Sequence, residues 1–412
     1  MKKILVLTST FPKNENDKVP TFVKDQITNL KKKYLDIEFL VLVPEVPDGL
    51  KNTQSKYFKE IRFHYFWPFR FEKLVGRGII PSIKENKLRF LLIPFYIVSQ
   101  IITLLSVIKK ERPSLIYAHW FTPQAISCYF ASFFYDIPFV FTTHAQDVII
   151  MKKIPVLGKF IAKKIIKKSK AWTCDSLSTE ERLINTIGRE NFQKDKSLVI
   201  PMAVDANSYE EIQELNYPEY SHLEKQFNIL FIGRFAEIKG VEYLINTFAK
   251  IYQEFPHANL ILGGDGPLRD KYSHLISELK IPKNRIIFTG YVDKGLKKYL
   301  FNIAKLVIVP SILSDTGHRE GMPVVLLESL YFGKMTMASK YCNAEDVIIN
   351  SNNGYIFDPL EEVNFLETVK TIANLNQEAF TKIEQNAKKI GSSFTDKNLT
   401  EKYYSHLFKN YI

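Results

Sequence analysis

The sequence predicts an α/β protein of two doubly wound domains, each a parallel sheet covered by helices. The 412 residues are enough for two or three domains with full cores, at about 150 residues per domain. Short β-branched or apolar runs alternate with longer stretches of helical period along most of the chain, as is typical of parallel sheets. A composition of 46% hydrophobic and 24% charged residues excludes a disordered or fibrous protein.

The first domain is predicted over residues 1–205, with seven strands. They are Lys3–Thr8, Ile37–Val43, Ile61–Phe66, Leu115–His119, Phe139–Thr143, Ala171–Cys174 and Leu198–Ile200. The pattern restarts in a second domain, predicted over residues 227–398. Its strands are Ile229–Ile232, Leu260–Leu262, Ile286–Phe288, Leu306–Val309 and Met335–Ala338.

The stretch between the two domains, residues 206–226, contains five glutamates, a proline and no strand pattern. It is predicted to be a linker. The C-terminal residues 399–412 have helical period and are predicted to pack back on the first domain. Ligands of open α/β sheets bind outside the carboxyl ends of the strands, so we expect the active site in a cleft between the two facing domains.

The charge of the chain is positive and unevenly spread. Lys and Arg number 56 against 44 Asp and Glu, a net charge of +12, and all of this excess lies in residues 1–205. Three widely separated cysteines exclude a disulfide scaffold and offer no zinc-ligand spacing, which favours a reducing, cytoplasmic compartment. The N-terminal run lacks a cleavage site of small residues, so we interpret it as a first strand, not a leader.

One apolar segment, Phe90–Ile108, has 19 residues without a charge, close to the length that spans a bilayer. It also contains a proline and several polar residues, and predicted strands of one sheet lie on both sides of it. A buried or membrane-grazing helix is therefore favoured over a transmembrane one.

Two glycine-containing loops follow strands of the second domain. In the first, Gly233-Arg234 and Lys239-Gly240 place two cations at a helix N-terminus, a position suited to a diphosphate. A solvated turn would show the same residues. The second loop includes Gly264 and Gly266, which a tight turn requires whether or not it binds a ligand. Arg269 replaces the third glycine of the dinucleotide fingerprint, and the P-loop pattern is absent.

Two carboxylates eight residues apart, Glu320 and Glu328, flank a predicted strand-to-helix turn. They can reach hydroxyls at two ends of one ligand, while Gly321-Met322-Pro323 presents backbone amides to an anion between them. A surface pair at a helix start would have the same spacing, because acids are favoured there. In the first domain, His144 follows a strand at a carboxyl end, where a histidine can be a site residue or a hydrogen-bonded core residue. His119 can likewise be a site residue or a core residue, and its position gives less support for a site.

These motifs together resemble those of the GT-B glycosyltransferases of family four, which take a sugar from a nucleotide sugar with retention. The resemblance covers nearly the whole chain, with Rossmann-like domains. It implies that Arg234 and Lys239 hold the donor diphosphate and Glu328 the ribose hydroxyls. It also implies that Glu320 binds the transferred sugar and that His144 lies near the reacting carbon.

Within the family, Ser9-Thr10-Phe11-Pro12 resembles the bacterial exopolysaccharide, lipopolysaccharide and capsule enzymes. The sequence departs from the family pattern at Pro20 and at Cys342-Asn343, where glycines are usual. The implied reaction transfers a hexose-type sugar from a nucleotide-diphosphate sugar to a glycan or lipid-linked acceptor. The chain has no Asp-x-Asp pair, which argues against a metal-dependent transferase, and no metal or other cofactor is expected. A nucleotide-sugar epimerase of the same fold, or a binding protein that has lost catalysis, would be alternatives.

The basic excess favours an anionic membrane surface as a further partner. Met151–Ala171 contains eight lysines, and Ile154, Leu157, Ile161 and Ile165 are predicted to share the opposite, apolar face. Aromatic residues alternate with arginines over residues 62–71, a composition suited to a lipid interface. We therefore expect peripheral binding to the inner face of the plasma membrane. A solvated lysine face on an ordinary helix is the alternative, and the chain has no recognisable nucleic-acid-binding module.

Overall fold

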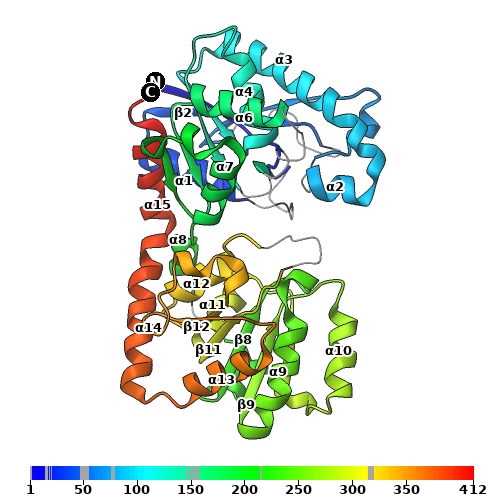
Figure 1. The fold of residues 1–412 in the computed structure, drawn as a ribbon, viewed down its shortest axis with the longest axis vertical. Helices are drawn as coiled ribbons and strands as arrows, with labels where there is room; N and C mark the ends of the chain where they lie inside the picture. The colour runs from blue at the N-terminus through cyan, green and yellow to red at the C-terminus, as the bar shows by residue number, and fades with distance from the viewer. Residues whose placement is uncertain are drawn as a thin grey trace. The chain divides into compact units, whose positions relative to one another are not determined.

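The computed structural model describes residues 2–13, 17, 19, 21–46, 55–75, 79–144, 147–148, 151, 157–213, 216–313 and 320–412. The chain divides into two compact units. Unit 1 consists of residues 1–200 and 400–412, and unit 2 of residues 201–399. Each unit is a parallel sheet covered by helices (Figure 1).

Unit 1 has a seven-stranded sheet in the order β3-β2-β1-β4-β5-β6-β7. The strands are β1 (Lys2–Leu7), β2 (Ile37–Pro44), β3 (Lys59–Phe63), β4 (Leu115–His119), β5 (Phe139–Thr143), β6 (Trp172–Cys174) and β7 (Ser197–Val199). The helices are α1 (Phe22–Lys33), α2 (Ile79–Glu85), α3 (Ile93–Glu111), α4 (Ile126–Ala131), α6 (Leu157–Lys168) and α7 (Leu177–Ile187). Because helices cover both faces, the central strands are apolar runs that are buried throughout, as in Ile4–Leu7.

Unit 2 has a six-stranded sheet in the order β10-β9-β8-β11-β12-β13. The strands are β8 (Phe227–Ile232), β9 (Ala258–Gly263), β10 (Ile286–Gly290), β11 (Leu306–Val309), β12 (Met335–Ser339) and β13 (Tyr355–Phe357). The helices are α8 (Ala206–Glu211), α9 (Val241–Glu254), α10 (Arg269–Glu278), α11 (Lys294–Ile303), α12 (Val324–Tyr331), α13 (Glu362–Ala373), α14 (Gln377–Gly391) and α15 (Asp396–Tyr403), which continues into unit 1.

The fold class predicted from the sequence is confirmed. All twelve predicted strands are present, and their ends differ from the prediction by at most three residues. In both sheets the strand order reverses once, after β1 and after β8, which makes the sheets doubly wound. The sequence did not reveal β13, whose three residues follow Asn352-Asn353-Gly354, a segment typical of a turn.

The structure places the division of the chain at Ile200, five residues before the predicted boundary. Residues 206–226, which the sequence predicts to be a linker, belong to unit 2 and include α8 and a 3₁₀ segment, Pro218–Leu223. Tyr209 of α8 is buried, which fixes this segment to the unit.

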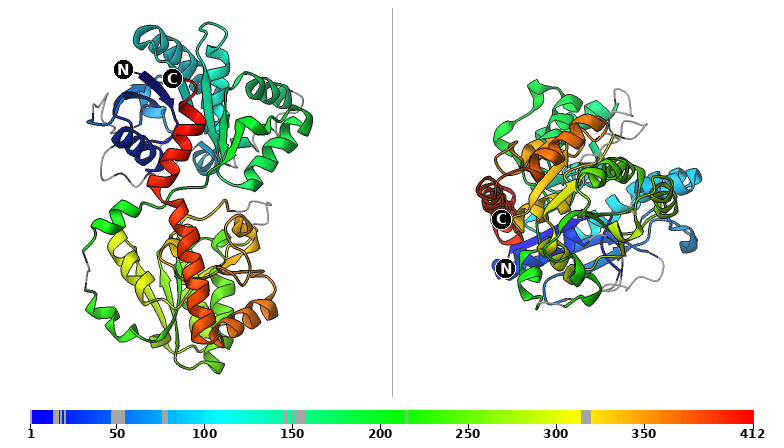
Figure 2. Two further views of the ribbon diagram at one scale, coloured as in Figure 1. Left: turned by 90° about the vertical axis from the view of Figure 1, so that its left-hand side faces the viewer. Right: turned by 90° about the horizontal axis from the view of Figure 1, so that it is seen from below.

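The C-terminal residues 400–412 pack on unit 1 (Figure 2). Tyr404 stacks on Tyr34 with ring centroids 3.6 Å apart, and the Phe408 ring lies 5.3 Å from that of Tyr117. The side chain of His406 is 3.1 Å from the backbone carbonyl oxygen of Trp172. These contacts attach the C-terminal residues to the end of α1, to β4 and to β6 of unit 1.

Helix α3 accounts for the long apolar segment. Among the described residues, one helical stretch, Lys87–Glu111, is long and apolar enough to cross a membrane. It lies between β3 and β4 of the same sheet and packs on α4. Both of its ends therefore stay within unit 1. Only 28% of its most apolar window is buried. Of the two forms expected for this segment, buried or membrane-grazing, a fully buried helix does not fit, because Leu91, Phe95 and Ile102 are exposed.

Candidate active site

The turns after two neighbouring strands of unit 2 are joined backbone to backbone. The amide of Gly233, after β8, donates to the carbonyl of Gly263 at 2.8 Å, and the amide of Phe235 donates to that of Asp265 at 2.9 Å. Gly264 has φ +134°, and a Cβ there would lie 1.9 Å from the Gly233 oxygen. Two backbones therefore approach so closely that only glycine fits, whatever the loop binds.

The same pair of turns holds the other residues predicted for donor binding. A Cβ at Gly266 would lie 2.5 Å from the Phe235 carbonyl oxygen, so this glycine also serves the close contact. Arg234, in the turn after β8, is exposed. The structure thus brings Gly233, Arg234, Gly264 and Gly266 together at the carboxyl edge of the sheet, where open α/β sheets bind ligands.

Lys239 and Glu320 meet at this edge although they lie 81 residues apart in the chain. The two side chains form an ion pair. Ser311, directly after β11, donates its hydroxyl to the second Glu320 oxygen, Oε2, at 2.6 Å. The side chains of Lys239 and Glu320 remain 22% and 18% exposed, so a ligand can reach both.

Glu328 lies in α12 and is buried against two partners that the sequence analysis missed. Tyr209 donates its phenolic hydroxyl to Oε1 at 2.6 Å, and Nζ of Lys297 lies 3.0 Å from each carboxylate oxygen. Burial and the neighbouring Glu328 carboxylate raise the pKa of Tyr209, so it donates at all ordinary pH values. A carboxylate has about four lone-pair positions, and these contacts leave little acceptor capacity for a ligand hydroxyl.

The residues before α12 present fewer amides than the sequence suggested. Pro323 is the N-cap of α12 and Met322 is buried. Proline has no backbone N–H, so of the three residues before α12 only Gly321 and Met322 carry an amide. The N–H groups at the N-terminus of α12 still favour binding of a negative charge there.

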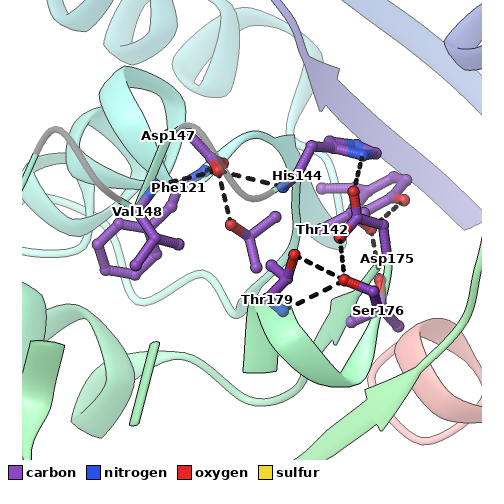
Figure 3. Close-up of polar contacts among 11 residues, drawn as sticks. Phe121, Thr142, His144, Asp147, Val148, Asp175, Ser176 and Thr179 are labelled. Carbon is purple, nitrogen blue, oxygen red and sulfur yellow. Dashed lines mark hydrogen bonds and ion pairs between the residues drawn. The ribbon is translucent and has the colours of Figure 1, made fainter. Parts of the chain in front are cut away.

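In unit 1, Asp147 organises the loop that carries His144. Its carboxylate accepts hydrogen bonds from the Phe121 amide at 2.5 Å, the Thr143 hydroxyl at 2.8 Å and the His144 amide at 3.1 Å (Figure 3). Burial raises the pKa of Asp147, although these donors and the charge of His144 oppose the shift. The carboxylate therefore has a structural role beside His144.

The imidazole of His144 is oriented by Asp175. Nδ1 lies 3.8 Å from Asp175 Oδ2, and Figure 3 shows the ring turned toward this carboxylate. Among the described residues, Nε2 of His144 has no hydrogen-bond partner. The rings of Phe22 and Trp120 flank it, with centroids 5.3 and 5.6 Å away. Nε2 is itself buried, so a substrate can reach it only if the side chains around it move.

His119 is a core residue and not a site residue. It is 1% exposed, and neither ring nitrogen has a hydrogen-bond partner within the part of the chain that the structure describes. Burial, and to a smaller extent the charge of His144, lower its pKa well below the ordinary value. His119 is therefore neutral at physiological pH.

Two family profiles match the chain. The profile described as "Glycosyltransferase Family 4" matches residues 20–208, and that described as "Glycosyl transferases group 1" matches residues 213–390. The chain belongs to glycosyltransferase family 4. This glycosyltransferase shares 23% identity with N-acetyl-alpha-D-glucosaminyl L-malate synthase of Bacillus anthracis, over 70% of this chain and 73% of that one.

A second relative supports the same assignment, and two solved structures share the fold. A Campylobacter jejuni N-acetyl-D-galactosaminyltransferase, named for a diNAcBac-PP-undecaprenol-linked glycan, is 25% identical over 71% of this chain and 74% of its own. Anabaena Alr3699/HepE, solved with UDP, aligns with a TM-score of 0.68 at 18% identity over 98% of this glycosyltransferase and 99% of its own chain. A Rickettsia africae glycosyltransferase aligns with a TM-score of 0.68 at 16% identity over 99% of both chains. The predicted GT-B fold and transferase class are confirmed.

Proposed function

We propose that this glycosyltransferase moves a hexose-type sugar from a nucleotide-diphosphate sugar to a glycan or lipid-linked acceptor. The reaction retains the anomeric configuration, needs no metal ion and serves cell-surface polysaccharide synthesis. The observation that carries the donor half is the Lys239–Glu320 ion pair at the carboxyl edge of the unit 2 sheet.

The cations at this edge suit the departing diphosphate. Transfer breaks the bond between the anomeric carbon and a phosphate oxygen, while the acceptor hydroxyl forms the new bond and loses its proton. Negative charge therefore grows on the diphosphate, and preorganised cations such as Lys239 and Arg234 stabilise it most in the transition state. A phosphate oxygen would compete with Glu320 for Lys239, and the freed carboxylate could accept from a sugar hydroxyl.

The ribose would be held by Glu328. Because Tyr209 and Lys297 already occupy most of its acceptor positions, a ribose hydroxyl would replace one contact of Lys297. In unit 1, His144 with Asp175 behind it would lie near the reacting carbon and the acceptor hydroxyl. The named substrate of the Campylobacter jejuni relative supports a lipid-linked acceptor.

We also propose peripheral binding at the inner face of an anionic membrane. Helix α6 exposes Lys159, Lys164, Lys167 and Lys168 and buries Ile165 and Ile166. Leu157, predicted on the apolar face, is 57% exposed, and Lys152, Lys153 and Ile154 lie outside the described residues. An exposed lysine face that begins with an exposed apolar side chain suits anionic headgroups.

The first test is the melting temperature of the purified enzyme with UDP, GDP, ADP, dTDP and CMP. A nucleotide at 100 times its Kd stabilises the protein by about 2.7 kcal/mol. A shift with one nucleoside diphosphate that Arg234→Ala abolishes supports the donor site and names the base. If no nucleotide shifts the melting temperature, with or without anionic vesicles, the donor assignment is wrong.

A further inference from the structure

The helical segment from Lys87 to Glu111 carries an apolar stripe on its outer face. Within the 3₁₀ helix η2 (Lys87–Leu92), Leu88 and Leu91 share a face because residues three apart eclipse each other. In α3, Phe95, Val98 and Ile102 continue this face at α-helical spacing. All five side chains are exposed, by between 52% and 73%.

The opposite face of α3 already packs in the core. Tyr96, Gln100 and Leu104 are fully buried. Ser127 of α4 donates to the Gln100 side chain at 2.9 Å, which fixes the rotation of α3 about its axis. The outer stripe therefore lies on the face of α3 opposite to the one that packs in the core of unit 1. Contiguous apolar surface of this kind marks an interaction site.

The aromatic loop after β3 extends this apolar surface. The Phe66 ring lies 5.1 Å from that of Phe95, which joins the loop to α3. Beyond this contact, Trp67 is 78% exposed, and Phe69 and Phe71 are also exposed. Because the loop follows β3 and His144 follows β5, both lie at the carboxyl edge of the same sheet. The apolar surface thus begins at the edge where the acceptor is proposed to bind.

The charges around the stripe are positive. No acidic residue occurs from Asn86 to Lys110, while Lys87, Lys109 and Lys110 are exposed at the two ends. The nearest acids are compensated, since Glu85 pairs with Arg89 at 2.9 Å and Glu111 pairs with Lys59 at 2.9 Å. The face is therefore apolar along its middle and basic at its rim.

We propose that η2 and α3 lie in the interfacial layer of an anionic bilayer, with the stripe Leu88, Leu91, Phe95, Val98 and Ile102 among the acyl chains. This names the inserting surface for the proposed membrane binding and rests on it. The stripe is about 23 Å long, at roughly 2.0 Å per residue in η2 and 1.5 Å per residue in α3. Such helices bury their apolar side roughly 5–10 Å deep. Lysines at the rim match anionic headgroups, and Trp67 suits the headgroup level.

Introduced cysteines can report insertion directly. Cys128, Cys174 and Cys342 are free and buried, so Val98→Cys can be labelled selectively with an environment-sensitive fluorophore. The matched control is Val363→Cys on α13 of unit 2, where the native side chain is 77% exposed. With vesicles containing phosphatidylglycerol, we expect a blue shift and quenching by brominated acyl chains for the label at position 98. The label at position 363 should show neither.

Substitution of the stripe tests its contribution to binding. Phe95→Gln with Ile102→Gln removes apolar area without adding charge. Each loss should weaken partitioning onto the vesicles about tenfold, and the pair about a hundredfold. Val363→Gln with Ile349→Gln removes two apolar side chains that are 77% and 62% exposed on unit 2 and should leave partitioning unchanged. Melting temperatures without vesicles confirm that each variant is folded.

Three results would overturn this assignment. If the wild type binds the vesicles but neither the label nor the double variant responds, another surface inserts and the proposed membrane binding survives. If the wild type binds no vesicle, membrane binding itself is wrong, while the nucleotide shift still tests the donor site. If the protein is a dimer without lipid and Phe95→Gln with Ile102→Gln makes it a monomer, the stripe binds a second copy of the chain.

Discussion

At the scale of single residues, the Lys239–Glu320 ion pair is the most informative contact of unit 2. It joins two loops from different strands at the edge where a donor would bind. Lys239→Ala removes a cation that would stabilise the leaving diphosphate, so we expect kcat to fall by about 10²–10³. Steady-state kinetics at saturating donor measure this loss.

The control for Lys239 lies nearby on the same unit. Lys271 forms an ion pair with Glu242 at 2.6 Å, and its side chain is 55% exposed. Lys271→Ala should leave kcat unchanged, because an exposed pair contributes little. A fall of less than fivefold for Lys239→Ala would contradict its role in catalysis.

The hydrogen bond from Tyr209 to Glu328 makes Tyr209 a positioning residue for the proposed ribose contact. Tyr209→Phe removes the hydroxyl and keeps the ring, so Glu328 loses one of its buried partners. A hydrogen bond to a charged group contributes about 1.5–3 kcal/mol, and we expect the donor Kd to rise at least about tenfold with little change in kcat. Calorimetric titration with the nucleoside diphosphate measures the Kd.

Tyr299→Phe is the matched control, since its hydroxyl donates to the exposed Glu224 at 3.1 Å and should not affect donor binding. An unchanged Kd for Tyr209→Phe would mean that Lys297 alone fixes the carboxylate. An equal rise in both variants would point to a general effect on unit 2.

His119 gives unit 1 a pH-dependent stability. Burial lowers the pKa of His119 in the folded protein. Below about pH 6.5, His119 therefore binds a proton in the unfolded chain but stays neutral in the folded protein. The free energy of unfolding therefore falls as the pH drops from about 6.5 toward the folded pKa, by up to about 1.4 kcal/mol per pH unit. His119→Phe should remove this part of the slope. Urea unfolding between about pH 5 and pH 7 checks it, and an equal slope in both proteins would contradict the burial argument.

At the scale of elements, the interlocked turns after β8 and β9 predict a steep cost for a single methyl group. Gly264→Ala places a Cβ 1.9 Å from the Gly233 carbonyl oxygen, so the two loops must separate. Gly290→Ala is the control, because its φ is +71° but no atom lies within 4 Å of its Cβ. It should cost only about 1 kcal/mol of backbone strain.

We expect the free energy of unfolding of unit 2 to fall by at least about 3 kcal/mol for Gly264→Ala, with loss of the nucleotide-dependent shift. Urea unfolding of both variants measures the difference. Equal costs at the two positions would show that conformation at φ > 0, and not the close contact, explains the glycine.

The elements show how far the sequence predicts the structure. Strands such as Leu115–His119 were found because they are buried on both faces and read as unbroken apolar runs. β13 was missed because its three residues follow Asn352-Asn353-Gly354, which reads as a turn. The family resemblance implied only that Lys239 and Glu320 contact the same donor, and their ion pair is seen only in the structure. Tyr209 was missed because it lies in a glutamate-rich stretch, and only tertiary packing reveals its role.

At the scale of the whole molecule, the chain passes from one unit to the other twice, after Ile200 and after Leu399. Within unit 2, the chain segments next to these two crossings are hydrogen-bonded to each other. The amide of Val204 donates to the Phe394 carbonyl at 2.9 Å, and the amide of Asp396 donates to the Val204 carbonyl at 2.9 Å. The last thirteen residues therefore follow a segment that is hydrogen-bonded within unit 2, and they pack on unit 1.

This arrangement predicts that a C-terminal substitution weakens the N-terminal unit. Phe408 is fully buried and packs on Tyr117, so Phe408→Ala should lower the free energy of unfolding of unit 1 by about 3–5 kcal/mol. Scanning calorimetry with and without the nucleoside diphosphate separates the units, because a ligand raises only the transition of the unit that binds it. Phe408→Ala should lower the other transition, whereas Glu401→Gln, which breaks an exposed ion pair with Lys33, should change it by less than about 0.5 kcal/mol. If Phe408→Ala instead lowers the transition that the nucleotide raises, the C-terminal residues stabilise unit 2 in solution and their assignment to unit 1 is wrong.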